Sequence, residues 1–290
     1  MNKPELYVGT AGWSYEDWLK VFYPFNQSRD FSWLKFYSRF FNHVEVNSTY
    51  YTYLSPKIAE NWMRQIEQGN DFYFTVKLHL DFTHRKIYGD EQIKSVKTNL
   101  EIIKENNRLA GLLIQFPYSF NLCEANINYL KSLIKIFEEY DQFIELRHKS
   151  WQNKTPKTVT FCSIDQPQIG DTVDFIPKVS REICYARFHG RNAEAWKKSL
   201  TGFKKPQTYQ EQSERYNYLY SIGEIMEFDF KIKEIYDKAK KIFVTMNNHP
   251  NGNAIVNAFE LMYFLRNKTK LNLPNTIKKA FPRLENISLN

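Results

Sequence analysis

Eight short apolar runs alternate with longer amphipathic stretches along the chain. Each run has the length of a β-strand, and this alternation is typical of βαβ units that build a parallel sheet. The runs are Leu6–Gly9, His43–Asn47, Phe72–His79, Leu112–Phe116, Phe143–Arg147, Val159–Ile164, Ile183–His189 and Ile242–Asn247. Because a closed (β/α)8 barrel needs eight such strands, the pattern predicts an α/β protein with a single (β/α)8 TIM barrel.

The amphipathic stretches have the periodicity of helices that cover the outside of a barrel. They are Phe31–Phe41, Pro56–Gln65, Glu91–Asn106, Ala125–Tyr140, Tyr209–Ile225 with Ile232–Lys240, and Ala254–Arg266. Ser55 is the expected N-cap before Pro56, and Asp90 is the expected N-cap of the third helix. The segments 151–158 and 166–181 are too short or too irregular for full helices. We therefore expect shortened connections after the fifth and sixth strands.

The length of the chain, 290 residues, fits one large domain, since a typical barrel of this kind needs about 250 residues. We expect the barrel to span 1–270 and a tail, 271–290, to pack on the barrel or extend from it. Three widely spaced cysteines predict neither a disulfide framework nor a structural zinc site. The chain shows no signal-peptide pattern and no long apolar span, so we expect a cytoplasmic protein without a membrane partner. The oligomeric state stays open.

The formal net charge of +8 is concentrated in the last third of the chain. From Trp196 onward there are 16 Lys and Arg against 9 Asp and Glu. A basic face of this kind would suit a nucleic-acid partner. Helical pairs such as Glu234 with Lys238 favour the alternative, in which these lysines lie on solvated helix faces.

Polar side chains alternate with apolar ones within most of the predicted strands. Successive side chains of a strand point to opposite faces, so the apolar set would face the helices and the polar set the barrel interior. The polar set comprises Glu45, Asn47, Thr75, Lys77, Gln115, Glu145, Arg147, Asp165, Tyr185, Arg187, His189, Thr245 and Asn247. Enzymes with this fold work at the C-terminal ends of the strands, so the set predicts a site there. An internal network is the alternative, in which the three carboxylates neutralise Lys77, Arg147 and Arg187.

Proton transfer at this site would fall to carboxylates and histidine. Glu45 and Glu145, with Asp165 as a weaker candidate, could serve as acid and base, and His189 as a general base. His84, His148 and His249 also lie at or after strand ends. No HxH or HExxH spacing occurs, and nearby cations would repel a metal ion, so we expect neither a metal nor another cofactor. Phosphate-binding loops and other nucleotide motifs are absent from the sequence.

Guanidinium and ammonium groups from several strands would suit an anionic ligand. The chain is also rich in aromatic residues, with 23 Phe, 19 Tyr and 6 Trp, which either pack or stack on a sugar-like ligand. The predicted substrate-binding residues are Trp13, Asn47, Tyr50, Lys77, His84, Gln115, Arg147, Arg187, Arg191, Asn247 and Asn248.

Ordered motifs recur along the chain from Leu6 to about Leu265. They include Gly9–Tyr15, Val44–Tyr51, Thr83–His84, Gln115–Pro117, Glu145–His148, Asp165–Pro167, Tyr185–Arg191, Arg215–Tyr216 and Asn247–Asn248. Together they resemble the YecE-like family, the domain of unknown function numbered 72. The resemblance implies a (β/α)8 barrel and carries no established activity. This chain departs from the family's pattern at His249 and in a shorter segment after Trp151.

The leading hypothesis is a metal-independent enzyme, a hydrolase, lyase or isomerase, that acts on a small anionic or sugar-like substrate at the mouth of the barrel. One alternative is a protein that binds or processes nucleic acid through its basic C-terminal third. Another is a barrel that binds a ligand without turnover.

Overall fold

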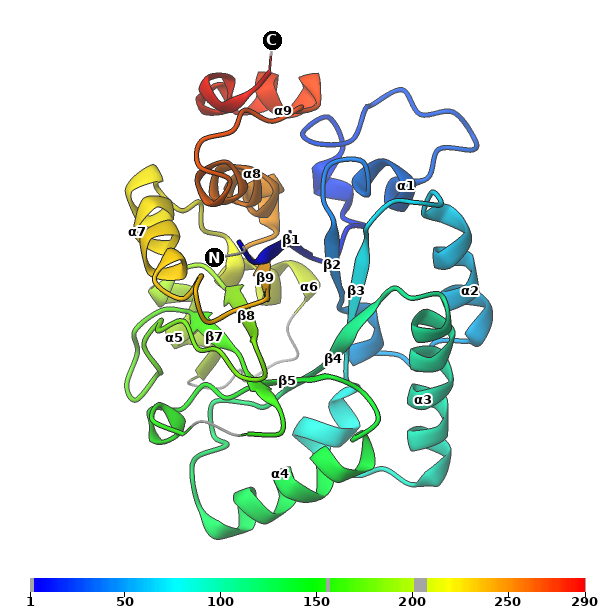
Figure 1. Ribbon diagram of the computed structural model, residues 1–290, viewed down its shortest axis with the longest axis vertical. Helices are drawn as coiled ribbons and strands as arrows, with labels where there is room; N and C mark the ends of the chain where they lie inside the picture. The colour runs from blue at the N-terminus through cyan, green and yellow to red at the C-terminus, as the bar shows by residue number, and fades with distance from the viewer. Residues whose placement is uncertain (1–2, 155–156, 201–207, 290) are drawn as a thin grey trace.

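The computed structural model describes residues 3–154, 157–200 and 208–289. Nine parallel strands form one nearly closed barrel with helices on its outside (Figure 1). The strands are β1 (Glu5–Ala11), β2 (His43–Val46), β3 (Tyr73–Lys77), β4 (Leu109–Gln115), β5 (Gln142–Glu145), β6 (Thr160–Phe161), β7 (Ser163–Asp165), β8 (Ile183–Phe188) and β9 (Lys241–Met246). Their order around the barrel is β6-β5-β4-β3-β2-β1-β9-β8-β7.

The predicted sixth strand is present but is interrupted at Cys162, between β6 and β7. The first part, β6, pairs with β5, and the second part, β7, pairs with β8. The backbone N–H of Cys162 still donates to the carbonyl of Ile144 at 2.9 Å, so contact with β5 continues through the interruption. This one run therefore joins the two edges of the sheet, and the predicted eight-stranded (β/α)8 barrel is confirmed.

Most of the predicted helices occur close to their expected positions. The helices are α1 (Trp33–Tyr37), α2 (Pro56–Gln65), α3 (Asp90–Glu105), α4 (Glu124–Ile136), α5 (Ala193–Leu200), α6 (Tyr209–Ser213), α7 (Ile222–Lys233), α8 (Asn253–Leu265) and α9 (Asn275–Ala280). The prediction missed α5 and α9. It joined α6 to the start of α7, although an irregular stretch after Tyr216 separates them, and it placed a gap at 226–231, where α7 is continuous. The prediction of Asp90 as an N-cap was wrong, because Gly89 takes that position and donates its N–H to the side chain of Gln92 at 2.9 Å.

The connections after β5 and β7 are short, as predicted. In the described residues, the first contains only the 3-10 turn Lys149–Trp151, and the second contains no helix before β8. The second connection instead pairs with the first, since the N–H of Val173 donates to the carbonyl of Arg147 at 3.0 Å. Trp151 of the first connection and Phe175 of the second are both buried and pack in the outer layer. Loop side chains therefore cover the strands where a helix would otherwise pack.

The core is divided between the barrel interior and the layer between strands and helices. Val44, Val46 and their counterparts on other strands pack in the outer layer. Inside the barrel, rings fill the N-terminal half, where Tyr7 stacks on Phe243 at 4.8 Å and Phe143 on Tyr185 at 4.3 Å. Because these rings fill the N-terminal half of the barrel interior, the inward polar side chains near the C-terminal ends of the strands gather in the other half.

The C-terminal segment 271–289 lies against α8, at the top of Figure 1. Leu271 pairs with Ser288, and Thr276 donates its hydroxyl to the carbonyl of Phe22 at 2.8 Å. The Arg283 guanidinium binds both oxygens of the Glu260 carboxylate, at 2.6 and 2.9 Å. Glu260 is only 2% exposed, so this ion pair links the tail to the barrel in a poorly hydrated place.

Replacing Arg283 with alanine is expected to lower the free energy of unfolding by about 2 kcal/mol. The Glu260 carboxylate would stay buried, and among the described residues only Asn257 would still donate to it. Urea unfolding of the full chain measures this change. Lys279→Ala, at an exposed position of α9, is the matched control and should change stability by less than about 0.5 kcal/mol. Equal effects of the two substitutions would contradict a clamp at Arg283.

Candidate active site

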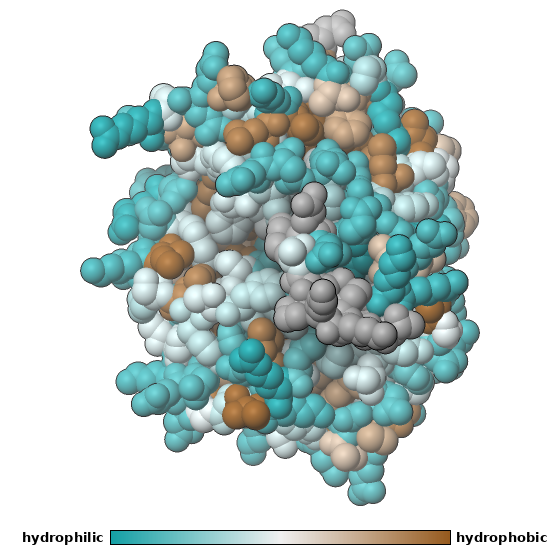
Figure 2. Space-filling model, turned by 180° about the vertical axis from the view of Figure 1, so that it is seen from behind, coloured by the Kyte–Doolittle hydropathy of each residue, from teal (hydrophilic) through white to brown (hydrophobic). Residues whose placement is uncertain are grey.

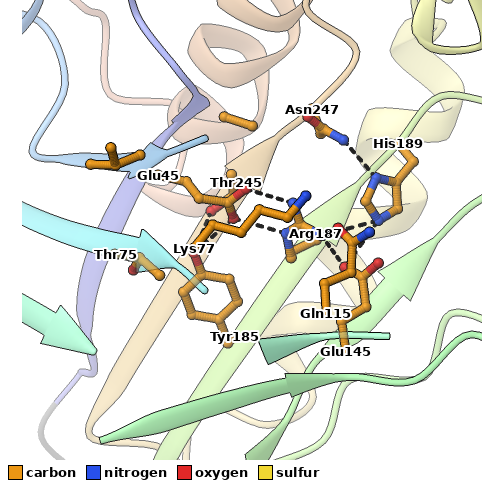
Figure 3. A network of polar contacts seen from close by, with 12 residues as sticks. Glu45, Thr75, Lys77, Gln115, Glu145, Tyr185, Arg187, His189, Thr245 and Asn247 are labelled. Atoms are coloured by element: carbon orange, nitrogen blue, oxygen red, sulfur yellow. Dashed lines mark hydrogen bonds and ion pairs between the residues drawn. The ribbon is translucent and has the colours of Figure 1, made fainter. Parts of the chain in front are cut away.

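Arg187 of β8 lies at the centre of a buried ion network that spans the barrel interior (Figure 3). Its guanidinium donates to both oxygens of the Glu45 carboxylate on β2, from Nε at 2.9 Å and from Nη2 at 2.6 Å. The remaining nitrogen, Nη1, binds Oε2 of Glu145 on β5. All three side chains are 0% exposed. One arginine therefore neutralises carboxylates from opposite walls of the barrel.

Further side chains complete the coordination of the two carboxylates. Arg147 donates from Nε to Oε1 of Glu145 at 2.6 Å, and Nε2 of His189 lies 3.2 Å from Oε2. The amide of Asn247 donates to Nδ1 of His189 at 2.8 Å, which leaves the imidazole proton on Nε2, facing Glu145. The carbonyl oxygen of Gln115 accepts from Arg187 at 3.3 Å, and the hydroxyl of Tyr185 donates to Glu45 at 3.2 Å.

The electrostatics of this network keep Glu145 charged and His189 neutral. Burial alone would raise the pKa of Glu145, but Arg187 and Arg147 hold it well below its usual range. Burial lowers the pKa of His189 to about 3, and the guanidinium of Arg147 works in the same direction. Two carboxylates thus face two guanidiniums. This is the internal network that the sequence left open as an alternative, except that Lys77 and Asp165 lie outside it.

Asp165 belongs to a second network, on the outer side of the loop after β8. Its carboxylate accepts from Arg191 at 2.7 Å and from the Tyr220 hydroxyl at 2.6 Å. Arg191 also binds Glu224 at 2.9 Å. Asn248 donates to the carbonyl of Tyr218 at 2.8 Å. The predicted site residues Asp165, Arg191 and Asn248 therefore anchor the loops after β7, β8 and β9, and the structure does not bring them to the pocket described next.

A pocket of about 310 Å³ opens where β1, β2, β3 and β9 end. Four of its lining residues are among the predicted ones, namely Trp13, Asn47, Lys77 and Asn247. The others are Gly12, Ser14, Tyr15, Ser48, Tyr51, Trp62, Tyr216 and His249. None of the lining residues that the structure describes is a carboxylic acid, although Glu45 comes from β2, one of the strands that end at the pocket.

Lys77 is the charged group that this pocket presents. Its Nζ lies 4.2 Å from the centre of the Tyr50 ring. Within the described ranges, this nitrogen has neither an ion-pair partner nor a hydrogen-bond acceptor among the side chains. Burial, followed by the positive charge of Arg187, lowers the pKa of Lys77 to about 7. A substantial fraction of this lysine is therefore a neutral amine near neutral pH.

Arg215 and two aromatic residues complete the surroundings of the mouth, and sequence reasoning did not single them out as site residues. The guanidinium of Arg215 lies 5.0 Å from the ring of Tyr216, and its buried Nε has no hydrogen-bond partner in the part of the chain that the structure describes. Trp62, from α2, meets Trp13 edge to face at 5.5 Å. The sequence motif Arg215–Tyr216 was a signal for Arg215 and Tyr216. Trp62 had no such signal, because it looked like an ordinary core residue of an amphipathic helix.

Tyr50 and His84, both predicted to bind substrate, lie beside this pocket. Their rings are 5.3 Å apart, and the Tyr50 ring carries the Lys77 ammonium on its face. His84 is exposed, and its Nδ1 lies 2.9 Å from the hydroxyl of Thr83. Both residues are therefore close enough to the mouth to contact a ligand that enters it.

The basic last third of the chain suggested a nucleic-acid partner, and acidic and histidine side chains are the groups that could bind a metal ion. Three lysines of the basic last third form ion pairs, Lys231 with Glu227 at 2.6 Å, Lys233 with Asp229 at 2.8 Å and Lys240 with Glu182 at 2.7 Å. Among the described residues, no three His, Cys, Asp or Glu side chains are grouped so that they could hold a metal ion. Figure 2 shows one face of the molecule, on which hydrophilic residues predominate and apolar residues occur in small groups.

The closed parallel sheet, its outer helices and the polar groups at the carboxyl ends of the strands define an α/β TIM-barrel protein. The chain belongs to the family described as protein of unknown function DUF72, whose model matches residues 7–280. No helix of the described part has the length and apolar content that crossing a bilayer requires.

Relatives and solved structures agree with this assignment. The UPF0759 protein YunF of Bacillus subtilis is 27% identical over 280 residues, which cover 90% of this chain and 94% of YunF. The UPF0759 protein YecE of Escherichia coli K12 is 26% identical over 147 residues, 49% of this chain and 48% of YecE. The crystal structure of a DUF72 family protein from Thermotoga maritima is similar with a TM-score of 0.73 at 30% identity, covering 90% of this chain and 99% of that one.

Proposed function

We propose that this protein is a metal-independent enzyme that binds a small anionic substrate in the pocket at the mouth of the barrel. One observation carries the proposal: the Lys77 ammonium faces a pocket whose described lining contains no carboxylate. Arg147 and Arg215 add to the same positive field, since both act on the neighbouring Tyr50. Such a field attracts an anion and repels a metal cation.

The remaining lining indicates what else the ligand carries. Trp13, Trp62 and Tyr51 offer flat apolar faces. The side-chain oxygen of Asn47 is buried and lacks a hydrogen-bond donor in the described part of the chain. A buried acceptor without a donor costs free energy, which a ligand hydroxyl would recover. These features favour a hydroxylated or sugar-like anion over a simple inorganic one.

The roles of the side chains in this proposal differ from those expected at first. Glu45, Glu145 and His189 hold Arg187 and one another below the pocket, so we assign them to positioning rather than to proton transfer. Lys77 is the group poised to exchange a proton near neutral pH, as general acid–base chemistry requires. This role fits a lyase, an isomerase or a hydrolase.

Titration with a panel of small anions tests the proposal. Sugar acids, hydroxy acids, oxo acids and sugar phosphates are added to the full chain, and thermal unfolding and calorimetry report binding. At least one class should bind, and Lys77→Met should weaken its affinity about tenfold or more, because a hydrogen bond to a charged group is lost. Lys57→Met, on the exposed face of α2, is the matched control and should leave affinity unchanged.

Two results would contradict the proposal. One is that no anion of the panel binds. The other is that Lys77→Met and Lys57→Met bind equally well. If an anion binds through Lys77 but no turnover follows for any member of its class, the barrel binds its ligand without catalysis.

A further inference from the structure

Resting on the proposed function, we propose that Lys77 forms a Schiff base with the carbonyl carbon of its substrate, which makes the substrate class a small oxo acid. Such a molecule carries both an anionic carboxylate and an electrophilic ketone or aldehyde. The geometry that points to it is an amine at the end of a barrel strand, facing a pocket of about 310 Å³ and unpaired with any described side chain.

The backbone of Lys77 is fixed on both sides, so its amine has a defined place. The hydroxyl of Thr49 donates to the Lys77 carbonyl at 2.6 Å, and the next residue, Leu78, donates its N–H to Leu113 at 2.8 Å. The side chain is half-buried and extends past the Tyr50 ring. A nucleophile held on a strand meets a bound carbonyl more reproducibly than one on a mobile loop.

The charges around Lys77 favour the neutral, nucleophilic form of the amine. Burial and the guanidinium of Arg187 lower its pKa, whereas Glu45 and Glu145 act in the opposite direction. Those two carboxylates are already bound to Arg187 through three hydrogen bonds or ion pairs, so neither forms a direct ion pair with the lysine. Desolvation and a neighbouring cation are the two influences that activate a lysine amine as a nucleophile, and both act on Lys77.

The chemistry is balanced without any oxidant, reductant or further co-reactant. The Nζ lone pair attacks the carbonyl carbon, so that a C–N bond forms as the C=O π bond breaks. The nitrogen then loses one proton and the carbonyl oxygen gains one, which gives a neutral carbinolamine. The hydroxyl then takes a proton from the solvent, the C–O bond breaks and water leaves, while the nitrogen lone pair forms the C=N bond of a protonated imine on Lys77. This cation withdraws electrons from the adjacent C–H and C–C bonds, so among the three reaction classes it favours a lyase or an isomerase.

Borohydride trapping tests the inference on the full chain. The protein is incubated with pyruvate or glyoxylate at pH 7, reduced with borohydride, and analysed by intact mass and peptide mapping. We expect one reduced adduct on the peptide that contains Lys77, for wild type and for the exposed-lysine control Lys57→Met. Lactate, an anion of similar size without a carbonyl at that carbon, should give none.

Two variants separate the Schiff base from simple anion binding. Lys77→Met should lose both the adduct and the affinity for oxo acids. Lys77→Arg keeps a cation but no nucleophilic amine, so it should still bind oxo acids and should give no adduct. The trapping rate of the wild type should rise through pH 7, whereas the labelling of exposed lysines should rise only at much higher pH.

Each outcome has one meaning. An adduct spread over many lysines, or none with either oxo acid while oxo acids still bind through Lys77, overturns the Schiff base and leaves the proposed function standing. An absence of binding by every anion of the panel overturns the proposed function itself. An adduct that persists in Lys77→Arg places the reactive amine at another lysine and also overturns the inference.

Discussion

Replacing Arg187 with methionine is expected to destabilise the protein by about 3–5 kcal/mol, because removing one partner of a buried ion pair leaves uncompensated charge in a poorly hydrated interior. Methionine fills a similar volume, so the loss would come from the charge and not from a cavity. Glu45 would lose both of its guanidinium bonds, and Glu145 would keep Arg147 as its remaining cation. Urea unfolding followed by circular dichroism measures the change.

A surface ion pair supplies the control for this experiment. Arg181 binds Asp141 at 2.8 Å, but both side chains are more than 40% exposed, and Arg181→Met should cost less than about 1 kcal/mol. The difference between wild type and Arg187→Met should narrow as the pH falls, because the buried carboxylates of the variant become neutral by binding protons. A difference that is small, or that stays constant down to pH 4, would contradict the assigned network.

Acidification from pH 7 to pH 4 is expected to destabilise the folded protein through its buried histidines. Burial lowers the pKa of His43 and of His189 to about 3, and that of His249 to about 4. In the unfolded chain these imidazoles take up protons near pH 6.5. The neutral histidines therefore contribute their full share to the free energy of unfolding above about pH 6.5. This share is lost progressively as the pH falls from about 6.5 towards 4.

The expected slope is on the order of 1.4 kcal/mol per pH unit for each histidine that is protonated only in the unfolded chain. Glu145 adds to the loss at still lower pH, since its pKa in the folded state is held below the usual range. Urea unfolding at pH 7, 6 and 5 measures the slope. His43→Asn should reduce the slope of the free energy of unfolding against pH by the contribution of one buried histidine. His148→Asn, at a partly exposed loop position, should leave this slope nearly unchanged. Equal slopes for both variants would contradict this account.

Much of the architecture was predictable because it depends on local pattern. Alternating side chains on each strand separated Val44 and Val46 from Glu45, and this placed the acid inside the barrel. Helix α2 was predicted with its observed bounds, since Pro56 marks its first residue. The breaks in the longer predicted helix between β8 and β9 were missed, because packing against the barrel and not local periodicity decides where such a segment turns.

The functional groups were predictable as a set but not as pairs. Glu45, Glu145, Arg147 and Arg187 were all expected to point inward, yet no spacing in the chain says which acid meets which base. The pairing follows from barrel closure, which brings β8 near enough to β2 and to β5 for Arg187 to reach both carboxylates. Lys77 was one cation among several in the sequence. This pairing leaves Lys77 without an acidic partner among the residues that the structure describes, and so makes it the candidate for chemistry.

Chain periodicity therefore established the barrel, the inward direction of its polar side chains and the short connections after the fifth and sixth strands, because these features depend on neighbours a few residues apart. Contacts between segments that are distant in the sequence decided which side chains line the pocket and which of them pair with one another. They brought Trp62 of α2 and Tyr216 to the same pocket and placed Asp165 and Arg191 in a separate network. They also left Lys77 without an ion-pair partner in the described ranges. Distances across a closed barrel depend on how every strand packs at once, so short-range sequence patterns do not encode them.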